Sequence, residues 1–118
     1  VYEDSHFTVI LDVNPATKGH CLIIPKEHFD NIYDLDGETA GKLFALATCI
    51  ARAMKDALKC DGLNLVQNNG EVAGQTVNHF HLHLIPRYEG DGLNLNWPQQ
   101  EISVEQLEEI RQSIKKSI

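Results

Sequence analysis

The chain has 118 residues and a mass of 13.2 kDa, a length that fits one domain built around a single core. Its hydrophobic fraction of 42% and charged fraction of 23% are ordinary globular values, and no apolar run approaches the roughly 18 residues of a membrane span. The net charge of −7, with no basic cluster beyond Lys115-Lys116, argues against binding to a nucleic acid backbone.

The cysteines indicate a reducing compartment. Cys21, Cys49 and Cys60 are odd in number, scattered, and form no C-x-x-C pair, so we expect free thiols and a cytoplasmic location. No charged segment followed by an apolar one opens the chain, so nothing marks it for secretion. Because YEDSHFTVILDV already reads as a strand from the start, we expect an upstream segment to be missing.

The first half of the chain predicts a hairpin followed by a long helix. The segments 6–13 and 20–24 are short β-rich runs separated by the turn-forming NPATKG, and Pro25 ends the second run. A polar connection leads to residues 38–58, whose apolar positions follow i, i+3, i+4 and i+7 spacing: Leu43, Leu46, Ala47, Ile50, Ala53, Met54 and Ala57. We expect this amphipathic helix to stop near Cys60-Asp61-Gly62, with the glycine as its cap.

The second half predicts two further strands and a short helix. Residues 63–67 read as a strand, NNGEVAGQ as a loop, residues 77–85 as a strand and residues 90–98 as irregular. Ser103 and Gln106 have capping-box spacing ahead of a helix over 104–114. The order ββαββα predicts an α+β domain spanning residues 1–118, with an antiparallel sheet of about five strands.

The predicted strand 77–85 contains NHFHLHLIPRY, in which three histidines alternate with apolar residues. Side chains alternate faces along a strand, so His79, His81 and His83 would share one face. The simplest explanation is the polar face of a half-buried strand. Three histidines at three same-face positions make that explanation a poor one.

A shared metal ion is one functional alternative. The Cα atoms of His79 and His83 would lie about 13 Å apart in a regular strand, whereas an imidazole and its metal bond reach on the order of 6–7 Å from Cα. All three histidines therefore do not close on one ion, although two of them could, or one with partners elsewhere. We expect the three to have different roles.

Nucleophilic catalysis is the other alternative. A neutral imidazole whose second nitrogen is held by a hydrogen bond can attack near neutral pH and form a covalent intermediate. Phosphorus suits such an attack, because positioning and charge stabilisation do most of the work. The preceding loop offers Gly74 for close backbone approach, N–H donors over residues 75–77 and the hydroxyl of Thr76. His83 could donate to a non-bridging oxygen.

The stretch HFHLHLI, with the flanking segments VYEDSHFTVILDVNPATKGHCLIIPKEH and GLNLVQNNGEVAGQTVNHFHLHLIPRY, resembles the histidine triad (HIT) family in its small, bacterial-type, nucleotide-binding branch. The resemblance covers roughly residues 1–97. It implies a nucleoside phosphoramidase or nucleotidyl hydrolase that acts on purine nucleotides, with His81 as the nucleophile and His83 on the phosphate. Further nucleotide-binding residues that it implies are Asp12 on the ribose, Val13 against the base, and Asn68, Gly74, Gln75 and Thr76 around the phosphate oxygens and leaving group.

Several of these residues have simpler explanations. Asp12 beside Asn14-Pro15 could be a turn residue, Asn68 could be ordinary loop chemistry, and Gly74 alone says little. These residues support a nucleotide site because all of them match the family pattern together. The alternative function from another class is a nucleotide-binding or zinc-binding interaction module with little turnover.

The sequence departs from the family at its start. Many bacterial members begin with a C-x-x-C segment that supplies two thiolates to a structural zinc, the other ligands being at positions that match His28 and His79. With only these two of four ligands present, we expect no stoichiometric zinc in this chain and no cofactor requirement; a structural zinc would belong to a longer form. The resemblance also implies a homodimer, with Trp97 either reaching the partner's site or serving as a tail anchor.

Overall fold

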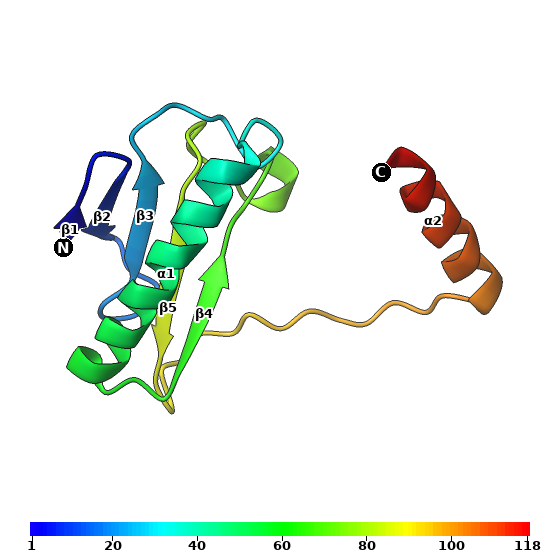
Figure 1. Cartoon of the computed structure of the whole chain (residues 1–118). Helices are drawn as coiled ribbons and strands as arrows, with labels where there is room; N and C mark the ends of the chain where they lie inside the picture. Colours follow the sequence, from blue (N-terminus) through cyan, green and yellow to red (C-terminus); the bar gives the residue numbers. More distant parts are fainter.

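The computed structural model describes residues 1–118, and its centre is a five-stranded antiparallel sheet (Figure 1). The strand order is β1-β2-β3-β5-β4, with bounds β1 Tyr2–Glu3, β2 Phe7–Leu11, β3 Cys21–Pro25, β4 Gly62–Val66 and β5 Leu82–Arg87. The predicted α+β class, the five-stranded antiparallel sheet and the hairpin of β2 with β3 are confirmed. None of the helices has the combination of length and apolar character that crossing a membrane requires.

Helix α1, Gly37–Leu58, lies across one face of the sheet (Figure 1). Asp36 caps its first turn by accepting a hydrogen bond from the Thr39 N–H at 3.0 Å. The helix ends at Leu58, as predicted, but glycine is not its cap: Lys59 adopts the left-handed conformation, with φ of 53°, and Gly62 opens β4 instead. The expected apolar stripe is buried at Leu43, Ala47, Ile50 and Met54, whereas Ala53 and Ala57 are exposed.

The core fills the space between α1 and the sheet. It contains alternate residues of three strands, Phe7 and Val9, Cys21 and Ile23, and Leu82 and Leu84, together with Phe29, Phe80 and the buried stripe of α1. Because side chains alternate along each strand, the intervening residues of β3 and β5, including Leu22 and His83, lie on the opposite face. The face away from α1 is therefore available for a site.

Strand β5 differs from its predicted bounds. It begins at Leu82 and continues through Pro86 to Arg87, so His79 and His81 precede the paired segment. The segment before β5 is held by other contacts, including the hydrogen bond from the Phe80 N–H to the Phe29 carbonyl at 2.6 Å. The loop predicted over NNGEVAGQ contains one short 3₁₀ helix, η1, Glu71–Ala73.

The C-terminal helix α2, Val104–Ser117, lies away from the body of the protein at the end of an extended segment (Figure 1). The predicted capping box is present, because Ser103 and Gln106 bond each other's backbone N–H groups. The helix runs three residues beyond its predicted end, and none of its residues is buried. The segment leading to it starts at Arg87, which pairs with both carboxylate oxygens of Asp91.

The core packing generates a prediction for stability. Leu84 is fully buried under α1, so Leu84→Ala should lower the free energy of unfolding by about 2–5 kcal/mol, measured by urea denaturation. Its cross-strand partner Leu65 is 40% exposed and provides a matched control, since Leu65→Ala removes much less buried area. Equal losses in the two variants would contradict the described core.

Candidate active site

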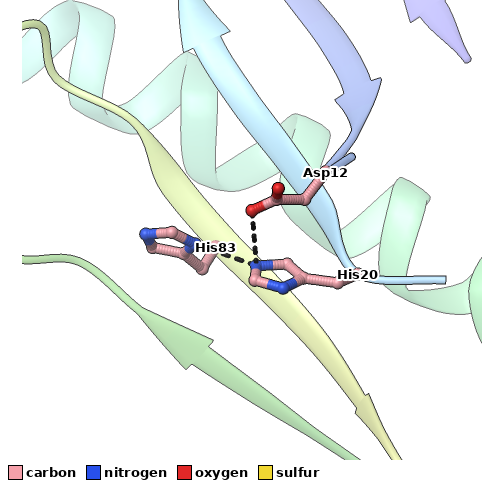
Figure 2. A group of neighbouring side chains, drawn as sticks. All are labelled: Asp12, His20 and His83. Carbon is pink, nitrogen blue, oxygen red and sulfur yellow. Dashed lines mark hydrogen bonds and ion pairs between the residues drawn. The ribbon is translucent and has the colours of Figure 1, made fainter. Parts of the chain in front are cut away.

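The site forms where β3 and β5 lie side by side on the face away from α1. Leu22 pairs with His83 in the register, and His20 stands immediately before β3. His20 is buried, and its Nε2 lies 2.9 Å from Nδ1 of His83 (Figure 2). Sheet pairing therefore brings together two histidines that are 63 residues apart in the sequence.

A backbone contact determines which ring nitrogen of His20 and of His83 carries the proton. The N–H of Ala16 donates to Nδ1 of His20 at 3.0 Å, so that nitrogen carries a lone pair. In neutral His20 the proton is therefore on Nε2, from where it donates to Nδ1 of His83. In neutral His83 the proton is then on Nε2. The contacts leave His83 with one free N–H donor.

Burial favours the neutral forms that this arrangement needs. It lowers the pKa of His20, an effect that the nearby carboxylate of Asp12 opposes. Burial is also the main cause of the lowered pKa of His83, and the charges of His81 and His20 add to it against Asp12. Both imidazoles thus stay neutral near pH 7. The two hydrogen bonds from Ala16 to His20 and from His20 to His83, called the relay below, therefore keep the same donor and acceptor at each end.

His81 carries the opposite tautomer. Its Nδ1 lies 2.8 Å from the backbone carbonyl oxygen of His79, which can only accept, so Nδ1 carries the proton. In the neutral ring the lone pair is then on Nε2. The ring centroids of His81 and His83 are 4.9 Å apart. An unprotonated nitrogen therefore stands beside a residue with a free N–H donor.

Asp12 lies at the edge of this pair. Its Oδ1 accepts from the Asn14 N–H at 2.8 Å, the turn interaction expected beside Asn14-Pro15, and its Oδ2 lies 3.8 Å from Nε2 of His20 (Figure 2). Ligand atoms of Asp12, His20 and His83 all lie within 4.8 Å of one another, close enough for a shared cation. However, the two imidazoles are joined by a hydrogen bond. That bond explains why they lie close together without a cation between them.

The loop before β5 contains the residues expected to surround the phosphate. Gly74 has φ of +94°, a conformation that favours glycine, and a Cβ there would lie 3.5 Å from Nδ2 of Asn68. The two residues expected at the phosphate are thus neighbours. Thr76, two residues further, is exposed, and so is Val13, which is 89% exposed beside Asp12.

Gln75 has a structural role that the sequence did not indicate. Its side chain is 8% exposed, its Nε2 donates to the carbonyls of Asp30 and Val77 at 2.6 and 3.0 Å, and its Oε1 accepts from Gly70 at 2.8 Å. Its own N–H also bonds to Gly70. Gln75 therefore ties the loop together, and its contact with a nucleotide stays a prediction.

His28 and His79 meet at a second point. Their Nδ1 atoms are 3.0 Å apart, although 51 residues separate them. Nε2 of His79 bonds to the carbonyl of Pro25 at 2.8 Å, and Nε2 of His28 to the carboxylate of Asp30 at 2.7 Å. Metal-binding histidines characteristically use their outer nitrogen in this way, which leaves the other nitrogen for the ion. The pair therefore fits two ligands of the zinc site that the resemblance implies.

The three motif histidines thus divide between two clusters, and His20 is a candidate site residue that sequence reasoning missed. His79 joins His28, whereas His83 joins His20 and lies beside His81. A lone histidine at the start of a strand carries no signal by itself. Only the pairing of β3 with β5 shows that it faces the motif.

Known proteins resemble this chain over its whole length. The protein called hit from Bacillus subtilis is 45% identical over all of this chain and 83% of its own length. The crystal structure of a HIT family protein from Bacillus anthracis superposes with a TM-score of 0.93 at 47% identity, covering 100% of this chain and 86% of that one. The adenosine 5′-monophosphoramidase HNT1 of Saccharomyces cerevisiae is 38% identical over 95% of this chain and 69% of its own length.

One solved relative is described as zinc-bound. It is a histidine triad family protein from Mycobacterium smegmatis, 39% identical with a TM-score of 0.74, covering 99% of this chain and 86% of that one. The family model described as HIT domain matches residues 1–90, which include every residue of both histidine clusters. The chain therefore belongs to the HIT family.

Proposed function

We propose that the protein is a nucleotide hydrolase that cleaves a P–N or phosphoanhydride bond of an adenosine nucleotide through a nucleotidyl intermediate on His81. The observation that carries this proposal is the hydrogen bond from Nδ1–H of His81 to the His79 carbonyl, because it leaves the lone pair on Nε2. A nitrogen in that state can attack the α-phosphorus without first losing a proton.

The reaction has two steps. In the first, Nε2 of His81 forms a bond to phosphorus while the bond to the leaving amine or phosphate breaks, and the leaving group takes a proton from a nearby donor or water. In the second, water attacks phosphorus, the P–Nε2 bond breaks, and the proton that water loses restores the donor of the first step, so the nucleoside monophosphate leaves with the imidazole regenerated. All groups used in either step belong to the chain, its substrate or water, so no cofactor is part of the proposal.

The remaining residues bind the nucleotide. Nε2–H of His83 donates to a non-bridging oxygen, and the relay through His20 keeps that proton in place. Asn68, Gly74, Gln75 and Thr76 surround the phosphate and leaving group. Asp12 binds the ribose hydroxyls, and the exposed Val13 lies against the base.

The comparisons support the substrate class. Two yeast relatives, 36% and 38% identical, are named adenosine 5′-monophosphoramidases, which favours an adenosine nucleotide here. The second candidate function is a nucleotide-binding or zinc-binding module with little turnover. The His28–His79 pair favours its zinc form, since it presents two ligand nitrogens 3.0 Å apart.

The roles of the three motif histidines predict different variant phenotypes. His81→Ala should abolish turnover of a fluorogenic adenosine phosphoramidate and leave AMP binding measurable, because Asp12 and the phosphate loop remain. His83→Ala should weaken both, since it contacts the phosphate throughout the reaction. His79→Ala should act mainly through structure. Exposed His6 supplies the control, because His6→Ala touches none of these groups.

The intermediate is observable directly. Rapid quenching under alkaline conditions, followed by peptide mass analysis, should find a nucleotidyl adduct on His81, since a phosphoramidate bond to imidazole is acid-labile. An adduct on His79 or His83, or near-normal turnover by His81→Ala, would rule out this mechanism. Tight AMP binding with no turnover by the wild-type chain would favour the binding module.

Because His20 and His83 are neutral in the folded protein, we expect its stability to depend on pH. The pKa of His20 and of His83 lies below the ordinary value of about 6.5, so in acid the unfolded chain binds more protons than the folded one. The free energy of unfolding should therefore be highest above pH about 6.5 and fall as the pH drops through that value. His20→Gln keeps an amide donor near His83 but does not titrate, so urea denaturation should show a shallower acid slope. An unchanged slope would contradict the prediction; His6→Gln is the control.

We also propose that the protein is a homodimer. Strand β4 is an edge strand, and α2 exposes an apolar face that includes Leu107, Ile110 and Ile114. Both features favour association with a second copy, which would also give Trp97, 81% exposed, a surface to contact. Light scattering at micromolar concentration should give twice the mass of one chain. A mass near 13.2 kDa would exclude the dimer.

A further inference from the structure

The loop between β2 and β3, residues 12–20, contains the backbone group that sets the tautomer of His20. The His20 N–H donates to the Thr17 carbonyl at 3.2 Å, which folds the loop back on itself. The Ala16 N–H thereby reaches Nδ1 of His20 at 3.0 Å. The position of the proton on His20, and with it the free donor of His83, therefore depends on where this loop lies.

Sheet pairing does not hold the loop, because the pairing of β3 with β5 stops at Cys21 and Leu84. Carbonyl groups point to alternate sides along a strand, and that of Arg87 bonds on the β4 side. The carbonyl of Pro86 therefore points to the other side, beyond the start of β3. There the hydroxyl of Thr17 donates to it at 2.5 Å, across 69 residues of sequence. This side chain takes the place of the missing strand contact.

The contact is buried at both ends. Thr17 is 8% exposed, and the Pro86 side chain is fully buried. A buried carbonyl that loses its donor is destabilised, so the hydroxyl and the carbonyl hold each other in place. The hydroxyl of Tyr88 also reaches the loop, at the Lys18 carbonyl, but that contact is exposed and water can replace it. Thr17 is thus the buried link between the loop and the strand that contains His83.

We propose that Thr17 is a positioning residue for phosphate binding at His83. Its hydroxyl fixes the loop on β5 and thereby holds the Ala16 N–H against Nδ1 of His20. When the loop moves away, Nδ1 of His20 can take the proton, and Nε2 then accepts from Nδ1–H of His83. His83 loses its free donor in that arrangement. The inference rests on the proposed function, in which this donor contacts the phosphate.

The test compares Thr17→Val, Thr17→Ser and Ile50→Ala in the full chain. Valine keeps the shape of threonine without its hydroxyl, serine keeps the hydroxyl, and Ile50→Ala lowers stability through the core under α1. Nitrogen-15 NMR near pH 7.5 should find the Nε2–H form of His20 and His83 in the wild type, in Thr17→Ser and in Ile50→Ala. In Thr17→Val a population of the Nδ1–H form should appear in both rings.

The second readout is nucleotide binding and turnover. Because the His83 donor contacts the phosphate throughout the reaction, Thr17→Val should weaken AMP binding and lower kcat/KM for a fluorogenic adenosine phosphoramidate about tenfold. Thr17→Ser, and Ile50→Ala below its melting temperature, should stay within about twofold of the wild type. Should Thr17→Val fail to fold, Thr17→Ala takes its place, since it leaves room for a water at the Pro86 carbonyl.

Unchanged tautomers or unchanged AMP binding in Thr17→Val would overturn the proposal. So would a Thr17→Ser variant that behaves like Thr17→Val, or an equal change of tautomer in Ile50→Ala, because either result would make the effect a general loss of stability. A wild-type chain that binds AMP without turnover of the phosphoramidate would refute the proposed hydrolase, whereas the NMR spectra and the AMP titration would still decide the role of Thr17.

Discussion

The proposed chemistry of this protein depends on one constraint: backbone groups fix the protons of His81 and His20, and His20 fixes that of His83. The His79 carbonyl holds the proton of His81 on Nδ1, and the Ala16 N–H forces that of His20 onto Nε2, which in turn sets His83. Neighbouring histidines thus acquire opposite tautomers, so that a lone pair stands beside a donor. Such a pair suits attack on phosphorus with simultaneous stabilisation of its oxygens.

The order of strands in the sheet places the histidines of the site beside one another. Strands β3 and β5 are neighbours although α1 and β4 separate them in the chain, and their pairing brings His20 to His83. Helix α1 covers the opposite face, where it buries Ile23 and Leu84. The core therefore fixes the strands without obstructing the histidine face. A second consequence is burial of His20, which keeps the relay neutral.

Local signals were sufficient for the main elements of the fold, although not for β1 or η1. The spacing of Leu43, Ala47, Ile50 and Met54 predicted α1, and the capping box at Ser103 predicted the start of α2. Boundaries were less predictable, because they depend on tertiary contacts. Strand β5 begins at Leu82 instead of residue 77, and left-handed Lys59 caps α1 in place of the expected glycine.

The site was predictable only where its residues belong to one motif. The motif supplied His81 and His83, and the structure separates His79, which contacts His28, from His83, which contacts His20; their different roles stay a prediction. The sequence could not indicate His20, since its importance arises from a contact across 63 residues. Nor could it show that buried Gln75 bonds to Asp30, Val77 and Gly70, because amide partners in loops depend on the folded backbone.

The tautomers of the imidazoles in the wild-type chain test the central claim most directly. Long-range proton–nitrogen NMR correlation near pH 7.5 distinguishes a ring protonated at Nδ1 from one protonated at Nε2. We expect the Nδ1–H form for His81 and the Nε2–H form for His20 and His83. A spectrum in which His81 carries its proton on Nε2 would contradict this assignment, because Nε2, the nitrogen proposed to attack phosphorus, would then have no lone pair.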